Sequence, residues 1–227
     1  MKSESKAPAA PTPKRILVLD DHPMTRRGVA ELICHQPGLT VSGEVGTARE
    51  ALVAVKTDPP DLVLCDLSLS ERSGLELIKD LHVLHPEVPV LVFSMHYESL
   101  YAERVLRAGA RGYIMKSEGG TKLVDAIRQV LDGGVYLSQV MRDRAVFRFA
   151  RGPAAINGDN TAALSDRELE VFELIGQGIG TRQIASRLHV STSTVETHRA
   201  HIKEKLQLAS APELVRAAVE WLGNRSA

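Results

Sequence analysis

Short apolar runs alternate with stretches of helical periodicity over residues 14–132 of the chain. Several runs are nearly unbroken in Val, Leu and Ile, which is typical of parallel strands buried on both faces. The runs predict strands over residues 15–20, 40–45, 61–67, 88–94 and 110–115, and the segments between them predict helices over residues 23–36, 47–57, 74–84, 98–108 and 119–132. This alternation predicts an α/β fold, an open and doubly wound parallel sheet of five strands.

The pattern changes in the second part of the chain. Residues 138–160 carry no strand pattern; a short basic helix fits their first half, and their second half is rich in Gly, Pro and Asn. Only short helical patterns follow, over residues 165–176, 180–187, 191–206 and 211–222. We therefore predict a disordered tail over 1–13, an α/β domain over 14–132, a linker with a short helix over 133–160, and a small all-helical domain over 161–227.

Composition changes this picture only by exclusion. The 28 Lys and Arg residues balance 28 Asp and Glu residues, so the whole-chain charge does not indicate a nucleic acid or a membrane as partner. No apolar run approaches the roughly 20 residues of a membrane span. Two cysteines, Cys34 and Cys65, lack the spacing of metal ligands and are interpreted as reduced thiols of a cytoplasmic protein.

Polar residues stand where the apolar runs end. Asp20 and Asp21 follow the first strand, and Asp66, Ser94 and Lys116 follow the third, fourth and fifth. Two adjacent carboxylates at the end of a buried strand need a cation, a basic side chain or solvent to compensate them. In a doubly wound sheet these positions meet at one edge, where ligands bind. One aspartate at a strand end is commonly a turn or cap residue, but the full set favours Mg²⁺ and a phosphoryl group.

The segments VLDDHP, DLVLCDLSLSERSG, VLVFSMH and GARGYIMK resemble the receiver domain of two-component response regulators. The resemblance implies a flavodoxin-like sheet with strand order 2-1-3-4-5, and Asp66 as the acceptor of a phosphoryl group from a sensor histidine kinase. It implies these further roles: Mg²⁺ held by Asp20, Asp21, Asp66 and the backbone carbonyl of Ser68; the phosphoryl group held by Ser94 and Lys116; and Tyr113 as the switch aromatic.

Other residues near this edge have simpler interpretations or depart from the family pattern. Cys65 points away from the side of Asp66 in the alternation of the strand, which favours core packing. His22 is interpreted as an exposed loop imidazole, because Mg²⁺ prefers oxygen ligands. Gly74 matches the glycine that follows the phosphorylation loop of the family. Many members carry Met-Pro where this chain has Leu69 and Ser70, and without the proline the loop is less restricted.

The helical domain begins with Ser165 and Glu168, the spacing of a capping box. Two later helices are separated by the short turn HVS, which predicts a helix-turn-helix. On a helical wheel of residues 193–206, Val195, Ile202 and Leu206 form the core stripe. The opposite face carries Glu196, Thr197, Ala200, His201, Lys203 and Glu204. A solvated helix would have a similar face, so periodicity alone leaves DNA binding open.

The segments LSDRELEV and IASRLHVSTSTVETH resemble the LuxR-type DNA-binding domain. With a receiver domain, this resemblance identifies the chain as a member of the NarL/FixJ class of response regulators. It implies base contacts from Glu196, Thr197 and Ala200, phosphate contacts from His198, Arg199, His201 and Lys203, and further contacts from Thr192, Ser193 and Thr194 at the helix start. Many members carry Lys where Glu196 stands; Glu either accepts from cytosine or is neutral to readout.

Charge and the last helix bear on assembly. Residues 161–227 hold eight Lys or Arg and eight Asp or Glu, so one copy would bind DNA weakly and a homodimer on two half-sites is expected. In the family the last helix pairs between DNA-bound protomers. Trp221, on that helix, packs into its own domain or joins such a pair, and the sequence leaves both open.

The favoured hypothesis is a cytoplasmic transcription factor, not an enzyme, in which phosphoryl transfer to Asp66 with Mg²⁺ controls dimerisation and binding to promoter DNA. A second hypothesis is an orphan regulator that uses the receiver as a phosphorylation-independent docking or dimerisation module; the intact acidic set and Lys116 argue against it. A third is a phosphatase or hydrolase, which is disfavoured because the sequence has no P-loop, nucleophile elbow or zinc signature.

Overall fold

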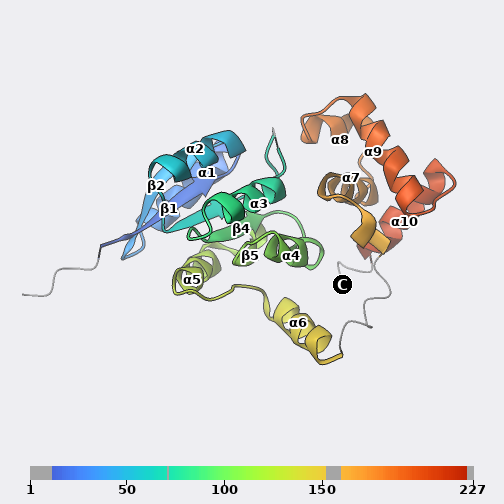
Figure 1. The fold of residues 1–227 in the computed structure, drawn as a ribbon. Coiled ribbons are helices and arrows are strands. Elements are labelled where there is room, and N and C mark those ends of the chain that lie inside the picture. The colour runs from blue at the N-terminus through green and yellow to red at the C-terminus, as the bar shows by residue number, and fades with distance from the viewer. Residues whose placement is uncertain (1–11, 71, 152–159, 224–227) are drawn as a thin grey trace, which may run out of the picture.

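A computed structural model describes residues 12–70, 72–151 and 160–223 of the chain (Figure 1). The predicted tail over residues 1–13 and the second half of the predicted linker lie almost wholly outside the described residues. Within the described residues, no helix is both long enough and apolar enough to cross a membrane.

The first domain is built on a parallel sheet with the order β2-β1-β3-β4-β5. Its strands are β1 (Lys14–Leu19), β2 (Leu39–Val45), β3 (Leu62–Cys65), β4 (Val90–Ser94) and β5 (Gly112–Met115). The fold class and the strand order implied by the receiver resemblance are thereby confirmed. Because all strands run in the same direction, their carboxyl ends meet at one edge of the sheet.

Helices cover both faces of the sheet (Figure 1). They are α1 (Pro23–Cys34), α2 (Ala48–Thr57), α3 (Gly74–Leu84), α4 (Glu98–Arg107) and α5 (Gly120–Leu131), and a short 3₁₀ helix, η1 (Lys116–Glu118), follows β5. Apolar side chains of α1 and α5 form one buried cluster with the sheet, and those of α2, α3 and α4 form a second cluster on the opposite face. Cys65 is fully buried in the second cluster, as its place in the strand predicted.

The rest of the described chain is helical. It comprises α6 (Gln139–Arg151), η3 (Asn160–Ala163), α7 (Asp166–Gly176), α8 (Thr181–Arg187), α9 (Thr192–Lys205) and α10 (Ala211–Gly223). The capping box predicted at the start of α7 is present, since the Ser165 hydroxyl accepts from the Glu168 amide and the Glu168 carboxylate accepts from the Ser165 amide. Helices α8 and α9 form the helix-turn-helix, and His189 in their turn adopts a left-handed φ of 51°.

Trp221 of α10 packs within its own domain. Its ring lies 5.2 Å from that of Phe172 on α7, measured between centroids. Helix α10 also approaches α7 closely at Gly176, where a Cβ atom would meet the carbonyl oxygen of Ala218 at 2.6 Å. Val215 and Val219 on the same helix are exposed.

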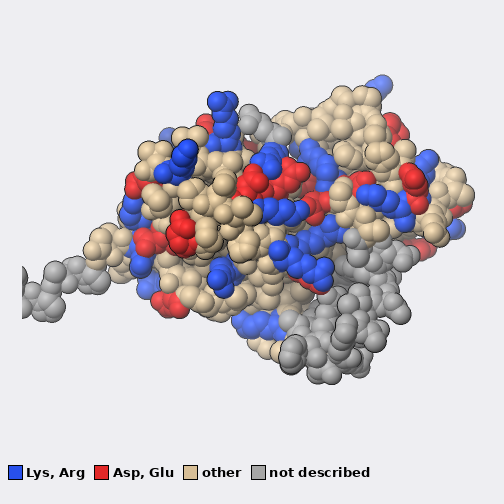
Figure 2. Space-filling model, in the orientation of Figure 1, with Lys and Arg blue, Asp and Glu red and all other residues tan. Residues whose placement is uncertain are grey.

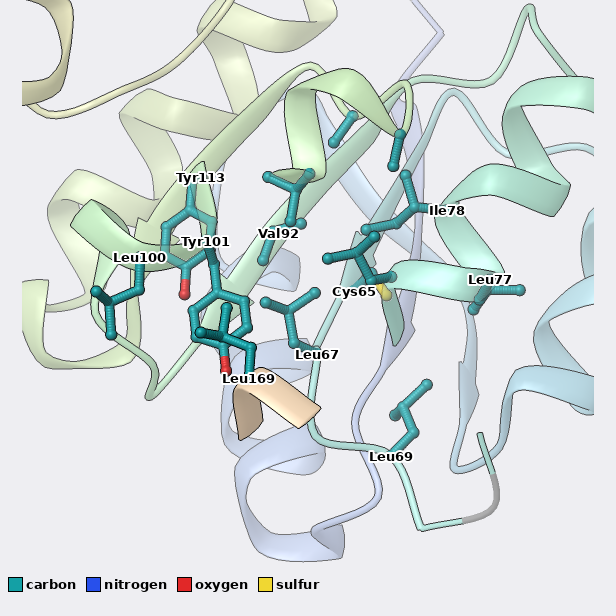
Figure 3. Packing of buried hydrophobic residues seen from close by; sticks show 14 of the residues in the cluster. Cys65, Leu67, Leu69, Leu77, Ile78, Val92, Leu100, Tyr101, Tyr113 and Leu169 are labelled. Carbon is teal, nitrogen blue, oxygen red and sulfur yellow. The ribbon is translucent and has the colours of Figure 1, made fainter. Parts of the chain in front are cut away.

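The two domains pack against each other through α7. The buried cluster on the α2–α4 face of the sheet continues into the helical domain, and Figure 3 shows Leu169 of α7 beside Tyr101 and Leu67 of the receiver. At the edge of this interface, Arg104 Nη1 lies 3.0 Å and Lys79 Nζ lies 3.1 Å from the carboxylate of Asp166. The contact surface therefore combines buried apolar side chains with ion pairs.

Candidate functional site

The sheet edge brings together the acidic residues that the strand pattern predicted there. Asp20 and Asp66 are each only 3% exposed. The ammonium group of Lys116 lies between them and donates to Asp20 Oδ2 and to Asp66 Oδ2, both at 2.6 Å. A basic side chain thus compensates Asp20 and Asp66, whereas Asp21 has no contact with Lys116 among the described residues.

Burial and charge shift the proton affinities of this group. Burial raises the pKa of the Asp66 carboxyl, and the charge and hydrogen bond of Lys116 oppose that rise. Burial lowers the pKa of Lys116, but the two carboxylates outweigh it, so the pKa lies above its ordinary value. Lys116 is thus held as a cation at the place where a phosphoryl group on Asp66 would carry its negative charge.

The donor set suits a hard divalent cation. Ligand atoms of Asp20, Asp21, His22 and Asp66 all lie within 4.8 Å of one another. Asp21 Oδ1 is buried and accepts no hydrogen bond from the described residues, although Nδ1 of His22 lies 2.7 Å away. The His22 side chain is 68% exposed, in agreement with its interpretation as a loop imidazole. Carboxylate oxygens gathered this closely fit Mg²⁺, which takes oxygen ligands and retains several waters.

Ser68, Ser94 and Tyr113 surround this acidic centre. The amide of Ser68 donates to Asp66 Oδ1 at 3.3 Å. Ser94 is fully buried at the end of β4, and its hydroxyl accepts from the amide of His96 at 3.3 Å. Tyr113 is also fully buried, and its hydroxyl donates to the carbonyl of His96 at 2.8 Å. Burial raises the pKa of Tyr113 well above its ordinary value, so this hydroxyl is a neutral donor.

Gly74 fixes the loop that carries Ser68. A Cβ atom at this position would lie 2.4 Å from the carbonyl oxygen of Asp66 and 2.7 Å from Cα of Leu67. The amide of Gly74 donates to the carbonyl of Leu67 at 3.0 Å. The start of α3 therefore packs directly on the backbone of Asp66 and Leu67, which explains why the loop needs glycine here.

The candidate nucleic-acid interface lies along α9. Val195 and Ile202 are fully buried and Leu206 is half-buried, as the helical wheel predicted. The residues with predicted DNA contacts all reach the surface: Thr192, Ser193, Glu196, Thr197, Ala200 and His201 are exposed, and Thr194, His198, Arg199 and Lys203 are half-buried. Basic and acidic side chains are interspersed on the face of the molecule shown in Figure 2.

Glu196 is held in place on this surface. Its Oε1 accepts from the Thr181 hydroxyl at 2.9 Å, and its Oε2 lies 3.6 Å from Nε of Arg199. The Ser191 hydroxyl caps α9 by accepting from the amide of Thr194 at 3.1 Å. Sequence reasoning had no signal for Thr181, because the pairing joins the start of one helix to the exposed face of another.

Sequence reasoning also missed His96 and Glu173. Nδ1 of His96 lies 2.8 Å from Oε2 of Glu173, and Nε2 of His96 lies 2.9 Å from the hydroxyl of Ser68. Burial lowers the pKa of His96, but the hydrogen bond and charge of Glu173 outweigh it and raise that pKa. The only available signal was the position of His96 two residues after Ser94.

Comparison with known proteins agrees with this geometry. The chain matches the family described as response regulator receiver domain over residues 16–128, and the family described as bacterial regulatory proteins, luxR family, over residues 162–218. It is 35% identical over 210 residues to the oxygen regulatory protein NreC of Staphylococcus carnosus (strain TM300), covering 91% of this chain and 97% of that protein.

Two solved structures are similar as well. One is a two-component response regulator of the LuxR family from Aurantimonas sp. SI85-9A1, with 34% identity and a TM-score of 0.56 over 58% of this chain and 94% of that one. The other is RcsB from Salmonella enterica serovar Typhimurium, bound to promoter rprA in the presence of phosphomimetic BeF3−, with 21% identity and a TM-score of 0.58 over 95% of this chain and 100% of that one.

Fold and site together define a response regulator with a receiver domain. More particularly, the chain belongs to the NarL/FixJ type, in which the receiver precedes a LuxR-type DNA-binding domain.

Proposed function

We propose that the chain is a phosphorylation-controlled transcription factor. The carboxylate of Asp66 attacks the phosphorus of a phosphohistidine on a sensor kinase, and the histidine leaves as the phosphoryl group is transferred. The phosphorylated chain forms a homodimer that binds two promoter half-sites in the cytoplasm. Receiver residues 14–132 carry the acceptor chemistry, and residues 161–227 carry the DNA contacts.

The single observation that carries this proposal is the placement of Lys116 between Asp20 and Asp66 at a buried sheet edge. Mg²⁺, when bound by Asp20, Asp21, Asp66 and the backbone carbonyl of Ser68, would neutralise charge on the oxygens of the phosphoryl group. The Lys116 ammonium pairs with the transferred group, and the Ser94 hydroxyl donates to it. Movement of Ser94 is transmitted to Tyr113 through the backbone of His96, because the Ser94 hydroxyl accepts from the amide of His96 and the Tyr113 hydroxyl donates to its carbonyl.

Beryllofluoride with Mg²⁺, a mimic of the phosphoryl group, tests the acceptor role. The wild-type chain is expected to dimerise and to bind a duplex selected from a random pool more tightly when the mimic is present. Asp66→Asn keeps the size of the side chain but removes the charge that the mimic and the cation require, so this variant is expected to show neither response. Light scattering gives the mass, and fluorescence anisotropy gives the DNA affinity.

Two other outcomes would contradict phosphorylation control. If the wild-type chain shows no change in mass or affinity, phosphorylation control is wrong. If Asp66→Asn supports normal target expression in cells, the chain acts as an orphan regulator whose receiver is a docking or dimerisation module.

Lys203→Ala tests the proposed phosphate contact. Because a phosphate contact carries no sequence information, affinity is expected to fall by a similar factor for every duplex, and the slope of log K against log salt by about one. Lys56→Ala, at an exposed site on α2 of the receiver, is the matched control and is expected to leave both quantities unchanged. A loss for Lys203→Ala that depends on the base sequence would contradict a phosphate contact.

A further inference from the structure

His96 joins the phosphorylation site to the DNA-binding domain. Its amide donates to Ser94, its carbonyl accepts from Tyr113, and its Nε2 contacts the hydroxyl of Ser68 at 2.9 Å. Its Nδ1 contacts Glu173, which lies on α7 of the other domain, at 2.8 Å. Of these receiver residues, Ser68 already contacts the Asp66 carboxylate, because its amide donates to Oδ1 at 3.3 Å.

Glu173 depends on this contact. Its side chain is 1% exposed, and its Oε2 also accepts from the hydroxyl of Tyr101 at 3.1 Å. The rings of His96 and Tyr101 pack together with centroids 4.7 Å apart. A buried carboxylate that loses its partner keeps its desolvation cost. Glu173 therefore loses one of its stabilising partners when His96 leaves its observed position, while Tyr101 and Gln177 still donate to its carboxylate.

The geometry points to Glu173 as a positioning residue of the phosphorylation site, contributed by the DNA-binding domain and acting through His96. This inference rests on the proposed function. With a phosphoryl group on Asp66, the Ser94 hydroxyl turns toward that group and away from the amide of His96, and the Ser68 hydroxyl gains a partner that competes with Nε2 of His96. His96 then leaves Glu173, and α7 separates from the receiver.

The coupling acts in both directions. If phosphorylation weakens the docking of α7, then docking of α7 must oppose phosphorylation by the same factor. Removing Glu173 therefore changes an affinity at Asp66, although Glu173 belongs to the other domain. A residue that only stabilised the fold of α7 would not have this effect.

The test measures beryllofluoride affinity at fixed Mg²⁺ by calorimetry on the full chain. Glu173→Ala is expected to tighten binding about tenfold, within the usual range of coupling between sites. Glu173→Gln retains an acceptor oxygen for His96 and is expected to restore much of the wild-type affinity. Amide hydrogen exchange of α7, recorded without the mimic, is expected to be faster in Glu173→Ala than in the wild type.

Arg104→Gln is the matched comparison, because Arg104 binds the carbonyls of Leu164 and Thr161 and the carboxylate of Asp166 without touching His96. It weakens docking at the other end of the interface and is expected to tighten beryllofluoride binding as well. In a His96→Leu background the contact that links Glu173 to the phosphorylation site is removed. Arg104→Gln and Glu173→Ala are then expected to cause no further change in beryllofluoride affinity. This comparison does not require Glu173→Ala to fold, since Arg104→Gln and Glu173→Gln suffice.

The outcomes separate this inference from the proposed function. If beryllofluoride fails to bind the wild-type chain, the proposed function is wrong and the inference falls with it. If the mimic binds the wild type and Glu173→Ala or Arg104→Gln with equal affinity, while α7 exchanges faster in that variant, the inference alone is overturned. An equal gain in affinity with and without His96 would also overturn it, because the coupling would then bypass His96.

Discussion

Lys116→Met is expected to destabilise the chain by about 3–5 kcal/mol in metal-free buffer, the usual effect of removing one partner from a buried ion pair. Lys116 is the shared partner of two carboxylates that are almost fully buried. Methionine has a similar length and fills the same space, so the loss reports the missing charge and not a cavity. Asp20 and Asp66 would face each other with Asp21 nearby, and their repulsion would add to the cost of burial.

Urea denaturation with and without Mg²⁺ measures this effect. A bound cation stabilises the folded state according to its concentration relative to its Kd, and Mg²⁺ is expected to stabilise the variant more than the wild type because it replaces the lost positive charge. Lys122→Met is the control: this lysine is 60% exposed and pairs with Glu118, four residues earlier in the chain, so a change below about 0.5 kcal/mol is expected. Equal losses of stability in the two variants would show that the buried pairing of Lys116 contributes no more than the exposed pairing of Lys122.

The sequence located the elements of the fold well, and the small errors have a physical cause. The strand predicted over 61–67 ends at Cys65, and the strand predicted over 110–115 begins at Gly112. Leu67 and Ala110 are nonetheless buried. Apolar runs report burial, whereas strand boundaries depend on ladder hydrogen bonds, and the two end at different residues where a loop passes through the core.

The candidate site was predictable to the extent that topology determines it. Parallel strands in a right-handed doubly wound sheet place their carboxyl ends together, so the meeting of Asp20, Asp66 and Lys116 followed from the strand pattern. The direct bridge by Lys116 did not follow, because the sequence allowed a cation or solvent in its place. The fold sets how far the side chain of Lys116 reaches, and a pattern of residue types does not contain that information.

The interface between the two domains could not be predicted from the hydrophobic periodicity of the sequence. Glu170 and Glu173 are buried on α7, yet charged residues in an amphipathic helix normally indicate its solvated face. Glu173 contacts His96 and Tyr101 of the receiver, far away in the sequence, whereas Glu170 pairs with Arg167 on its own helix. A helical wheel shows which face of a helix packs into the core of its own domain. It does not show that a second domain covers another face of the same helix.

Gly74→Ala is expected to destabilise the chain by at least about 1–3 kcal/mol, the usual cost of overpacking, and to lower the affinity for beryllofluoride at the same time. The added methyl group would meet the carbonyl oxygen of Asp66 and Cα of Leu67 well inside contact distance. These are backbone atoms, so no side-chain rotation relieves the overlap. Either α3 retreats or the segment that follows β3 moves, and both displace the Asp66 carboxylate relative to Lys116.

Gly28→Ala gives the matched control, because Gly28 lies within α1 and a Cβ atom there would have no neighbour within 4 Å. Alanine is the better helix former, so this substitution is expected to stabilise the chain by about 0.5–1 kcal/mol. Urea denaturation gives the stabilities of both variants, and calorimetry gives their beryllofluoride affinities. A stability gain for Gly74→Ala similar to that for Gly28→Ala would mean that α3 is free to move, and the contact between α3 and the backbone of Asp66 would then not position the Asp66 carboxylate.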